Sequence, residues 1–583
     1  MSRIAIVDRS KCIREKCGYI CVKVCPGVRM GDETVTVDSE GWPVISEMLC
    51  TGCGICPKRC PVDAITIINL AQELTEPFHS YGINSFRLYN MPLPQKTGVV
   101  GLIGKNGIGK STAIKILSGR LAPNLGAIDG EEQKAKMNIE QKAYFSKLGQ
   151  NGLSISYKPQ NIEKITDLFK GTVSDLFEKT EKMSEARLNT AVEKLSISPI
   201  LSREIRHLSG GELQRVAIAA AYSKDADLYY FDEPASYLDI EQRLAMANLI
   251  QSLSEQKPVI VVEHDLALFD YLSDYVYVFY GEENAYGVVS GVKSARTGIG
   301  EYLEGYLKSE NVRFRTEEIK FEKYSAEAGK GKAILSYPEM RKSFDSFSLS
   351  CEEGSLNAGE IVGIVGRNAV GKTVFIKMLA GLEHPDNDAP LPKLKVSYKP
   401  QYIRAETEMT VLDLFNSLPL NSFVLEECKR RLLLHSLLER SVMHLSGGEL
   451  QRVSIATALS QEADIYLFDE PSAFLDIEQR LHFAHLLRSV IADTDKVAFV
   501  VDHDVVLIDL VSNRIMPFEG QASINGHAPA PMKKRDGMNK FLSALGITLR
   551  RDKSTLRPRI NKAGSVLDRE QKEMGEYYYV TDS

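Results

Sequence analysis

Two long stretches of the chain alternate short apolar runs with segments of helical periodicity. In the first stretch the apolar runs are VVGLIG (99–104), LYYF (228–231) and VIVV (259–262). The second stretch repeats them as IVGIVG, IYLF and VAFVV, again separated by helical patterns and glycine-rich loops. Strand, glycine-rich loop and helix in alternation predict two α/β domains, each with a largely parallel sheet.

Sequence motifs indicate that the two stretches are copies of one domain. LSGGELQRVAIA at 208–219 returns at 445–456 as LSGGELQRVSIA, and FDEP and LDIEQR return at the same offset of 445 − 208 = 237 residues. The loops GKNGIGKST and GRNAVGKTV and the tetrapeptide YKPQ recur in the same order. Between its loop and YKPQ the first copy has 50 − 29 = 21 extra residues, rich in Lys, Glu and Gln. They predict an exposed helical insert near 130–150.

The repeat divides the chain into five parts. We expect a cysteine-rich domain at 1–75, the first copy at 76–300, a polar hinge at 301–330, the second copy at 331–525 and a basic tail at 526–583.

The charge balance limits the class of partner. The chain has 71 basic and 77 acidic residues, a net charge of −6, and 44% of its 583 residues are hydrophobic. This composition is ordinary for a globular protein and does not indicate a generally basic nucleic-acid binder. Residues 533–562 are the exception, with ten Lys or Arg against two Asp, a net charge of 10 − 2 = +8. This segment binds a phosphate backbone, packs as a hinge between the two copies, or does both.

The cysteines gather at the N-terminal end. No run of 18 apolar residues is present, and the start MSRIAIVDRSKC has no apolar signal segment, so we expect a soluble intracellular protein without a membrane partner. Eight of the ten cysteines lie in the first 60 residues, and such clustering favours metal over disulfides. They form the runs Cys12-x4-Cys17-x3-Cys21-x3-Cys25-Pro and Cys50-x2-Cys53-x2-Cys56-x3-Cys60-Pro.

These runs follow the pattern of bacterial ferredoxins, in which three cysteines hold one [4Fe–4S] cluster and the fourth binds the other. The pattern predicts two [4Fe–4S] clusters, one held by Cys12, Cys17, Cys21 and Cys60 and the other by Cys50, Cys53, Cys56 and Cys25. Zinc is the alternative, because C-x2-C pairs also build zinc ribbons, but two runs that both close with Cys-Pro favour clusters.

Both glycine-rich loops match G-x-x-x-x-G-K-[ST], the P-loop, whose backbone N–H groups cradle phosphates at a helix N-terminus. The expected ATP-binding residues are Gly104, Asn106, Gly107, Gly109, Lys110, Ser111 and Thr112 in the first copy, and Gly366, Asn368, Gly371, Lys372 and Thr373 in the second. The lysines would reach the β- and γ-phosphates, and Ser111 and Thr373 would help to hold Mg²⁺.

An Asp-Glu pair follows an apolar run in each copy. Asp232 and Asp469 would bind Mg²⁺ at a strand end, and the next residues, Glu233 and Glu470, would polarise the attacking water. A solvated acidic pair is the alternative, which the joint recurrence of the motifs disfavours.

One difference between the copies predicts unequal sites. The second loop has Ala369 where the first has Gly107, and Val374 where the first has Thr112. If this position requires a positive φ, alanine is penalised, so we expect the second site to be distorted or slower.

The LSGGE segments resemble the signature of the ATP-binding cassette (ABC) family. The resemblance implies two cassettes arranged head to tail, with Ser209, Gly210 and Gly211 facing the nucleotide on Lys372, and Ser446, Gly447 and Gly448 facing the nucleotide on Lys110. It further implies Q-loop glutamines that also approach Mg²⁺ (Gln160, Gln401), D-loop aspartates (Asp239, Asp476) and catalytic switch histidines (His264, His503). Tyr81, Phe86 and Phe347 precede the P-loops and either stack on adenine or belong to the core.

Over its whole length the chain resembles the ABC class E (RNase L inhibitor) family, including HSYGINSF (79–86), ENVRFR (310–315) and LDREQKEMGEYYY (567–579). The resemblance implies a monomeric ATPase that splits post-termination ribosomes with a release factor or its paralogue and remains on the small subunit. It implies initiation factors as further partners, and a cytoplasmic, ribosome-associated location that extends to the nucleus. The insert would be a shortened helix–loop–helix that contacts the ribosome.

Three other functions are weighed against ribosome recycling. An ATP-gated iron–sulfur redox protein would need a reductase, and no flavin or nicotinamide motif accompanies the cysteines. A twin-cassette translation factor without clusters does not account for the eight cysteines. A subunit that energises a membrane transporter is disfavoured by fused cassettes with an iron–sulfur domain. The favoured hypothesis is a clamp in which two ATP molecules lie between the cassettes and closure moves the cluster domain.

Overall fold

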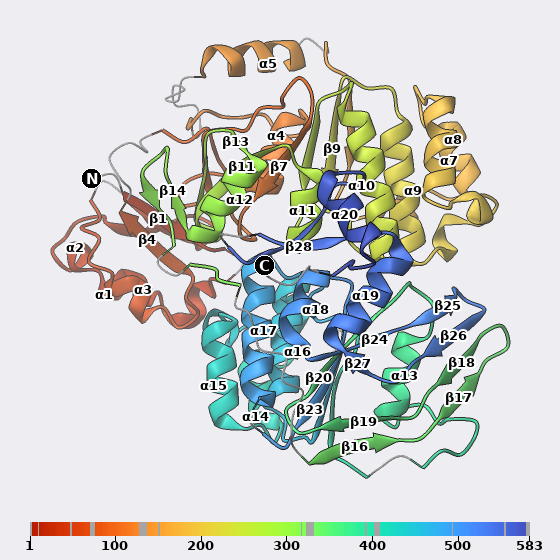
Figure 1. The fold of residues 1–583 in the computed structure, drawn as a ribbon. Coiled ribbons are helices and arrows are strands. Elements are labelled where there is room, and N and C mark those ends of the chain that lie inside the picture. The colour runs from red at the N-terminus through yellow and green to blue at the C-terminus, as the bar shows by residue number, and fades with distance from the viewer. Residues whose placement is uncertain are drawn as a thin grey trace.

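The computed structural model places a small N-terminal domain beside the first of two stacked cassettes, with the C-terminal segment between the cassettes (Figure 1). The structure describes residues 3–9, 11–46, 49–69, 76–127, 137–149, 152–315, 318–321, 332–390, 393–401, 408–492, 494–552 and 555–578. Within these ranges, none of the helices combines the length and hydropathy that a membrane-crossing helix requires.

The N-terminal domain is built from two antiparallel strand pairs and short helices. Strand β1 (Arg3–Val7) pairs with β4 (Ile65–Asn69), and β2 (Val35–Val37) pairs with β3 (Pro43–Ile45). The helices are α1 (Ile20–Val24), α2 (Pro26–Arg29), α3 (Ile55–Arg59) and the 3-10 turn η1 (Arg14–Cys17). The buried core of this domain consists largely of small aliphatic side chains and cysteines. So small a core needs further crosslinks for stability.

The first cassette is a nine-stranded sheet with the strand order β5-β6-β12-β11-β7-β10-β9-β8, and β13 pairs with β11. Its strands are β5 (His79–Ser80), β6 (Arg87–Tyr89), β7 (Val99–Ile103), β8 (Ile155–Lys158), β9 (Leu228–Asp232), β10 (Val259–Val262), β11 (Tyr275–Glu282), β12 (Tyr286–Val289) and β13 (Lys293–Ser294). Strands β11, β7, β10, β9 and β8 are parallel, and every residue of β7, β9 and β10 is buried. Apolar runs form these strands because helices cover both faces of a parallel sheet.

Helices of the first cassette are α4 (Lys110–Leu117), α5 (Ile139–Gly149), α6 (Glu163–Leu168), α7 (Val173–Lys179), α8 (Glu185–Lys194), α9 (Gly210–Ser223), α10 (Ile240–Ser254), α11 (Leu266–Leu272) and α12 (Ala295–Glu304), with 3-10 turns η2 (Ser198–Ile200) and η3 (Ile205–His207). Helix α5 forms the second half of the expected insert and lies at the outer edge of the molecule (Figure 1). The first half of the insert lies outside the described residues.

The second cassette repeats this topology. Its main sheet has the order β21-β22-β23-β20-β24-β27, which corresponds to β8-β9-β10-β7-β11-β13 of the first cassette. The strands are β16 (Ala333–Tyr337), β17 (Met340–Ser343), β18 (Ser348–Cys351), β19 (Gly354–Asn357), β20 (Ile361–Val365), β21 (Val396–Lys399), β22 (Ile465–Asp469), β23 (Val497–Val501), β24 (Arg514–Pro517), β25 (Glu519–Gln521), β26 (Asn525–Ala528) and β27 (Met532–Lys533). The helices are α13 (Lys372–Leu379), α14 (Val411–Ser417), α15 (Ser422–Arg431), η4 (His435–Leu437), η5 (Val442–His444), α16 (Gly447–Ser460), α17 (Ile477–Ile491) and α18 (Val505–Val511).

Elements at the expected domain boundaries belong to the cassettes. Helix α12 continues past residue 300. Strand β26 begins at residue 525 and β27 follows it, and both pair with strands of the second cassette. The hairpin β14 (Tyr306–Leu307) and β15 (Val312–Arg313) then leads to Arg315, which pairs with Glu478 of α17. After β27 the tail forms α19 (Lys534–Leu545), β28 (Leu549–Arg551), β29 (Pro558–Ile560) and α20 (Val566–Glu573).

The tail joins the two cassettes through buried carboxylates at equivalent positions. Asp270 is the fifth residue of α11 and Asp509 the fifth residue of α18. Asp270 accepts hydrogen bonds from Arg557 Nη2 (3.2 Å) and Arg559 Nε (2.6 Å), while Asp509 pairs with the tail residues Lys534 (2.9 Å) and Arg551 (2.9 Å). These four basic residues of the tail therefore contact a helix of each cassette.

Removing one carboxylate should loosen this joint. In Asp270→Ala, Arg557 would remain buried without its paired carboxylate and Arg559 would keep only Asp552 (3.4 Å). We therefore expect the free energy of unfolding to fall by about 3–5 kcal/mol and the tail to be released early in limited proteolysis. The control is Asp225→Ala, which breaks the solvent-exposed pair with Arg187 (2.9 Å) and should cost no more than about 1 kcal/mol. Equal losses in the two variants would contradict the structural role of Asp270.

Candidate active site

Each P-loop connects a buried strand to a helix that begins at the motif lysine. The Lys110 ammonium curls back and donates to the carbonyls of Gly104 (2.7 Å) and Lys105 (2.6 Å). In the second cassette Lys372 donates to the same two loop positions at 2.9 and 2.6 Å. Burial lowers the pKa of both lysines to about 8, against the opposing effect of nearby carboxylates. A phosphate bound at the helix N-terminus would favour the charged form of each lysine further.

The predicted general bases lie at the ends of β9 and β22. Glu233 Oε1 accepts from Gln160 Nε2 (2.6 Å) and lies 3.5 Å from His264 Nε2. Glu470 has the same neighbours, with Gln401 at 2.8 Å and His503 at 3.6 Å. Burial opposes ionisation of both glutamates, but the adjacent histidine and lysine outweigh it. They lower the pKa of Glu233, and they lower the pKa of Glu470 to about 2. Both carboxylates are therefore ionised and able to polarise water.

The carboxylates of Asp232 and Asp469 fit a divalent cation. Burial, followed by the charge of the adjacent glutamate, raises the pKa of each to about 6. The Oδ1 atom of each is buried and has no hydrogen-bond partner in the described part of the chain. Thr373 Oγ1 donates to Asp469 Oδ2 (2.8 Å), so the hydroxyl and the carboxylate expected at Mg²⁺ already lie together. Hard oxygen ligands of this kind are those that Mg²⁺ prefers.

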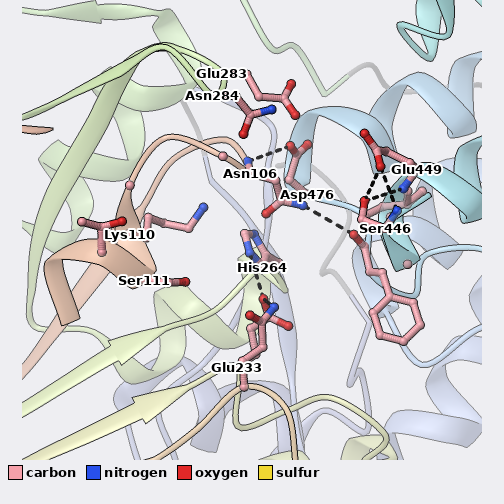
Figure 2. Close-up of a pocket in the computed structure, with 18 of the residues that line it drawn as sticks. Asn106, Lys110, Ser111, Glu233, His264, Glu283, Asn284, Ser446, Glu449 and Asp476 are labelled. Carbon is pink, nitrogen blue, oxygen red and sulfur yellow. Dashed lines mark hydrogen bonds and ion pairs between the residues drawn. The ribbon is translucent and has the colours of Figure 1, made fainter. Parts of the chain in front are cut away.

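The signature segments begin helices in the opposite cassette. Ser446 caps α16 in a capping box with Glu449, and Ser209 caps α9 in the same way with Glu212. Figure 2 shows Ser446 and Asp476 facing Lys110 and Ser111 across one cavity. The backbone N–H groups at the start of such a helix, with the positive end of its dipole, suit a γ-phosphate.

Backbone hydrogen bonds tie each P-loop to the D-loop of the other cassette. Asn106 N donates to Asp476 Oδ2 (3.3 Å), and Asn368 N donates to Asp239 Oδ2 (2.9 Å). Asn368 Nδ2 also reaches the Tyr237 carbonyl (3.3 Å), close to Gly211. The head-to-tail arrangement is confirmed, and each site consists of one P-loop and the opposite signature helix.

The cavity at the first site measures about 1080 Å³ and is lined by all three domains. The cassettes contribute the residues shown in Figure 2, and the N-terminal domain contributes Asp8, Arg9 and Lys11, which sequence reasoning missed. No local motif marks these three residues, because only the packing of the domains brings them to the site. A nucleotide in this cavity would therefore adjoin the cysteine-rich domain.

The candidate adenine-stacking residues lie beside this loop. Tyr81 lines the cavity, is half-exposed and shares a hydrogen bond with Thr112 Oγ1 (3.2 Å). Phe86 and Phe347 pack at equivalent places against Gly109 and Gly371, where an added Cβ would lie 2.8 and 3.0 Å from the rings. Phe86 and Phe347 also contact the apolar cores of their cassettes.

The structure brings the eight cysteines together in two groups. Cys25, Cys50, Cys53 and Cys56 line one small cavity. Burial, followed by the charges of its three partners, raises the pKa of Cys56 to about 12. Burial and the charges of Cys17, Cys12 and Cys60 likewise raise the pKa of Cys21 to about 11. Each group therefore takes three cysteines from one run and a fourth from the other.

The thiols of both groups are free rather than paired in disulfides. In the part of the chain that the structure describes, no three His, Cys, Asp or Glu side chains converge on a position for a single metal ion. Four soft sulfur donors around a cavity fit an iron–sulfur cluster.

These features define the class of protein. A 4Fe-4S binding domain model matches residues 43–66, and an ABC transporter model matches residues 91–236 and 352–473. The fold and sites are thus those of a twin-cassette ATPase of the ABC class with a ferredoxin-type domain.

Relatives that match over the full length identify the family within this class of ATPases. The chain is 42% identical to "Translation initiation factor RLI1" of Saccharomyces cerevisiae over all of this chain and 99% of that protein. A chain of "Model of ribosome-bound archaeal Pelota and ABCE1" matches at 46% identity and a TM-score of 0.92, covering 99% of both chains. A chain of the complex of "archaeal ribosomal stalk protein aP1 and archaeal ribosome recycling factor aABCE1" matches at 48% identity and a TM-score of 0.81, covering 88% of this chain and 100% of that one. The chain belongs to the ABC class E family.

The two P-loops should work at different rates. Ala369 has a φ of +59° where Gly107 has +71°, so an L-residue occupies a left-handed position in the second loop at a cost of about 1–2 kcal/mol. We expect Glu233→Gln, which leaves the second site active, to retain less ATPase activity than Glu470→Gln. Steady-state phosphate release from the two variants measures the difference, and equal rates would refute it.

Matched changes at the two loops check the cause. Ala369→Gly should raise phosphate release in the Glu233→Gln background because glycine adopts this φ without strain. Gly107→Ala should lower it in the Glu470→Gln background, since a Cβ there would lie 2.8 Å from Asn284 Oδ1. If neither change alters phosphate release, backbone strain is not the cause of the difference between the two sites.

Proposed function

We propose that this chain is an ATP-dependent ribosome recycling factor, which splits post-termination ribosomes with a release factor or its paralogue and remains on the small subunit. The observation that carries the proposal is the shared first site. Two P-loops, each completed by the opposite cassette, form a clamp, and the cysteine-rich domain lines the cavity of one of them. The full-length similarity to a ribosome-bound ABC class E protein supports the ribosome as the substrate of this clamp.

The site residues act as follows in this proposal. The P-loops and signature helices hold two ATP molecules. Ser111, Asp232 and Gln160 would hold Mg²⁺ at the first site, and Thr373, Asp469 and Gln401 would hold it at the second. When bound, Mg²⁺ neutralises charge on the phosphates. Glu233 and Glu470 polarise the attacking water, and His264 and His503 orient these carboxylates. ATP drives closure because the closed clamp binds it more tightly, and hydrolysis releases the clamp.

The side chain of Asn84 connects the border of the first site to the cysteine-rich domain. Asn84 lies in the loop between Tyr81 and Phe86, at φ +52°. Its Nδ2 donates to the carbonyls of Ala5 (2.7 Å) and Ile45 (3.0 Å), and its Oδ1 accepts from Ile45 N (2.7 Å). Because these bonds bind the loop to strands β1 and β3, movement of the nucleotide loop would carry the cysteine-rich domain with it.

The proposed partners are the small ribosomal subunit, a release factor or its paralogue, and initiation factors. The titles of the matched structures name Pelota and the stalk protein aP1 as the partners of similar proteins. Helix α5, whose Ile139 is highly exposed, offers a surface for the ribosome. We propose a monomer with a cytoplasmic, ribosome-associated location that extends to the nucleus. No feature of the described residues favours the redox alternative.

Iron analysis tests the two proposed clusters. Anaerobically purified protein should contain about eight iron atoms, four in each [4Fe–4S] cluster. Cys60→Ser should lower this to about four, because it removes one ligand of the group that contains Cys12. The control is Cys351→Ser, a buried cysteine of the second cassette that should leave the iron content unchanged. Stoichiometric zinc in place of iron would refute the clusters.

Sucrose-gradient sedimentation tests recycling. Protein, whole ribosomes and a release factor are run with ATP, with a non-hydrolysable analogue or without nucleotide. We expect subunits to replace whole ribosomes in the ATP sample, with the protein on the small subunit. In the analogue sample the protein should be trapped there, because the clamp closes and cannot reset. Iron-loaded, ATPase-active protein that stays at the top of every gradient would contradict the proposed function.

A further inference from the structure

Each cassette buries a lysine at the end of the strand that precedes the Q-loop. Lys158 is the last residue of β8 and Lys399 the last residue of β21, and they are 1% and 0% exposed. Lys158 Nζ donates to the carbonyls of Asp232 (2.9 Å) and Glu233 (3.0 Å). Lys399 Nζ donates to the equivalent carbonyls, of Asp469 at 2.9 Å and Glu470 at 3.2 Å.

A charged group at these positions is costly for the fold. Burial of an ammonium disfavours its charged form, and both lysines are almost completely removed from solvent. An apolar side chain of similar shape would fill the same space without this desolvation. Because both copies keep the lysine and the same two acceptors, packing alone does not account for it.

The acceptors are the backbone of the glutamates proposed to activate water. Glu233 and Glu470 adopt left-handed backbone conformations, with φ of +46° and +48°. A non-glycine residue stays in this region only where its surroundings hold it there. The Glu233 carbonyl accepts from Lys158 and also from Gln214 Nε2 of α9 (2.9 Å), and Gln451 Nε2 does the same for Glu470 (2.9 Å).

Lysine and glutamine of the YKPQ segment hold opposite ends of one glutamate. Lys158 is the last residue of β8, Gln160 follows two residues later, and both side chains reach Glu233. Lys158 holds the main chain of Glu233, and Gln160 holds its carboxylate (2.6 Å). We infer that Lys158 and Lys399 are positioning residues, which fix the backbone of the catalytic glutamate so that its carboxylate meets the attacking water. The inference rests on the proposed function, in which Glu233 and Glu470 polarise that water.

Double variants separate positioning from folding. In the Glu470→Gln background, where the first site turns over, Lys158→Met should lower kcat for ATP by about tenfold or more, since small displacements of a catalytic group are costly. KM and the Kd of a fluorescent ATP analogue should change less than about twofold, because Lys158 donates its hydrogen bonds to the carbonyls of Asp232 and Glu233 and not to the phosphate loop. In the Glu233→Gln background Lys158→Met should cause almost no further loss, because the glutamate it positions has already been replaced.

The opposite cassette provides the matched control. Lys399→Met should lower kcat in the Glu233→Gln background and have little further effect in the Glu470→Gln background. Lys158→Gln keeps a hydrogen-bond donor, so its kcat should be higher than that of Lys158→Met. If Lys158→Met is insoluble, Lys158→Gln takes its place in the same set of double variants. Equal losses in both backgrounds would identify a general folding role and overturn the inference.

The inference and the proposed function fail in different ways. If the glutamine variants of Glu233 and Glu470 do not reduce ATPase activity, the proposed catalytic role itself is wrong. If they do reduce it and Lys158→Met in the Glu470→Gln background keeps full kcat, only the positioning role is overturned.

Discussion

The structure depends on two backbone hydrogen bonds, one from each P-loop to the D-loop of the opposite cassette. Asp476 is buried, but the N–H groups of Gln479 and Asn106, together with the charges of His264 and Lys110, hold its pKa below the usual value. This ionised carboxylate therefore belongs to one cassette and completes the electrostatic environment of the other. Because the relation is reciprocal, neither site is complete unless both cassettes hold the same relative position.

The tail and the N-terminal domain use this arrangement in different ways. The tail binds Asp270 and Asp509, equivalent positions of the two copies, so it spans the joint between them. The N-terminal domain is bound by Asn84 to the loop that borders the first cavity. The two copies of the site therefore differ in a described feature, because residues of the cysteine-rich domain line the cavity of the first site.

Much of this fold could be predicted because its signals are local and occur twice. Buried parallel strands require continuous apolar runs, and phosphate loops require glycine at defined places, so both leave a readable pattern. The positive φ at Ala369 follows from comparing two loops of one chain. Residues such as Asp8 and Lys11 carry no such pattern, because their contribution to the first cavity arises from contacts between domains.

The sequence by itself determined the two α/β cassettes, their order along the chain and the chemical types available at each site, since strand burial and loop geometry constrain neighbouring residues. Only the tertiary structure decided that Lys158 points at the carbonyl of Glu233, that four basic tail residues face buried carboxylates, and which domain adjoins the first site. These features depend on the burial of charged groups and on hydrogen-bond acceptors that are distant in the sequence. Local sequence patterns indicate neither of these.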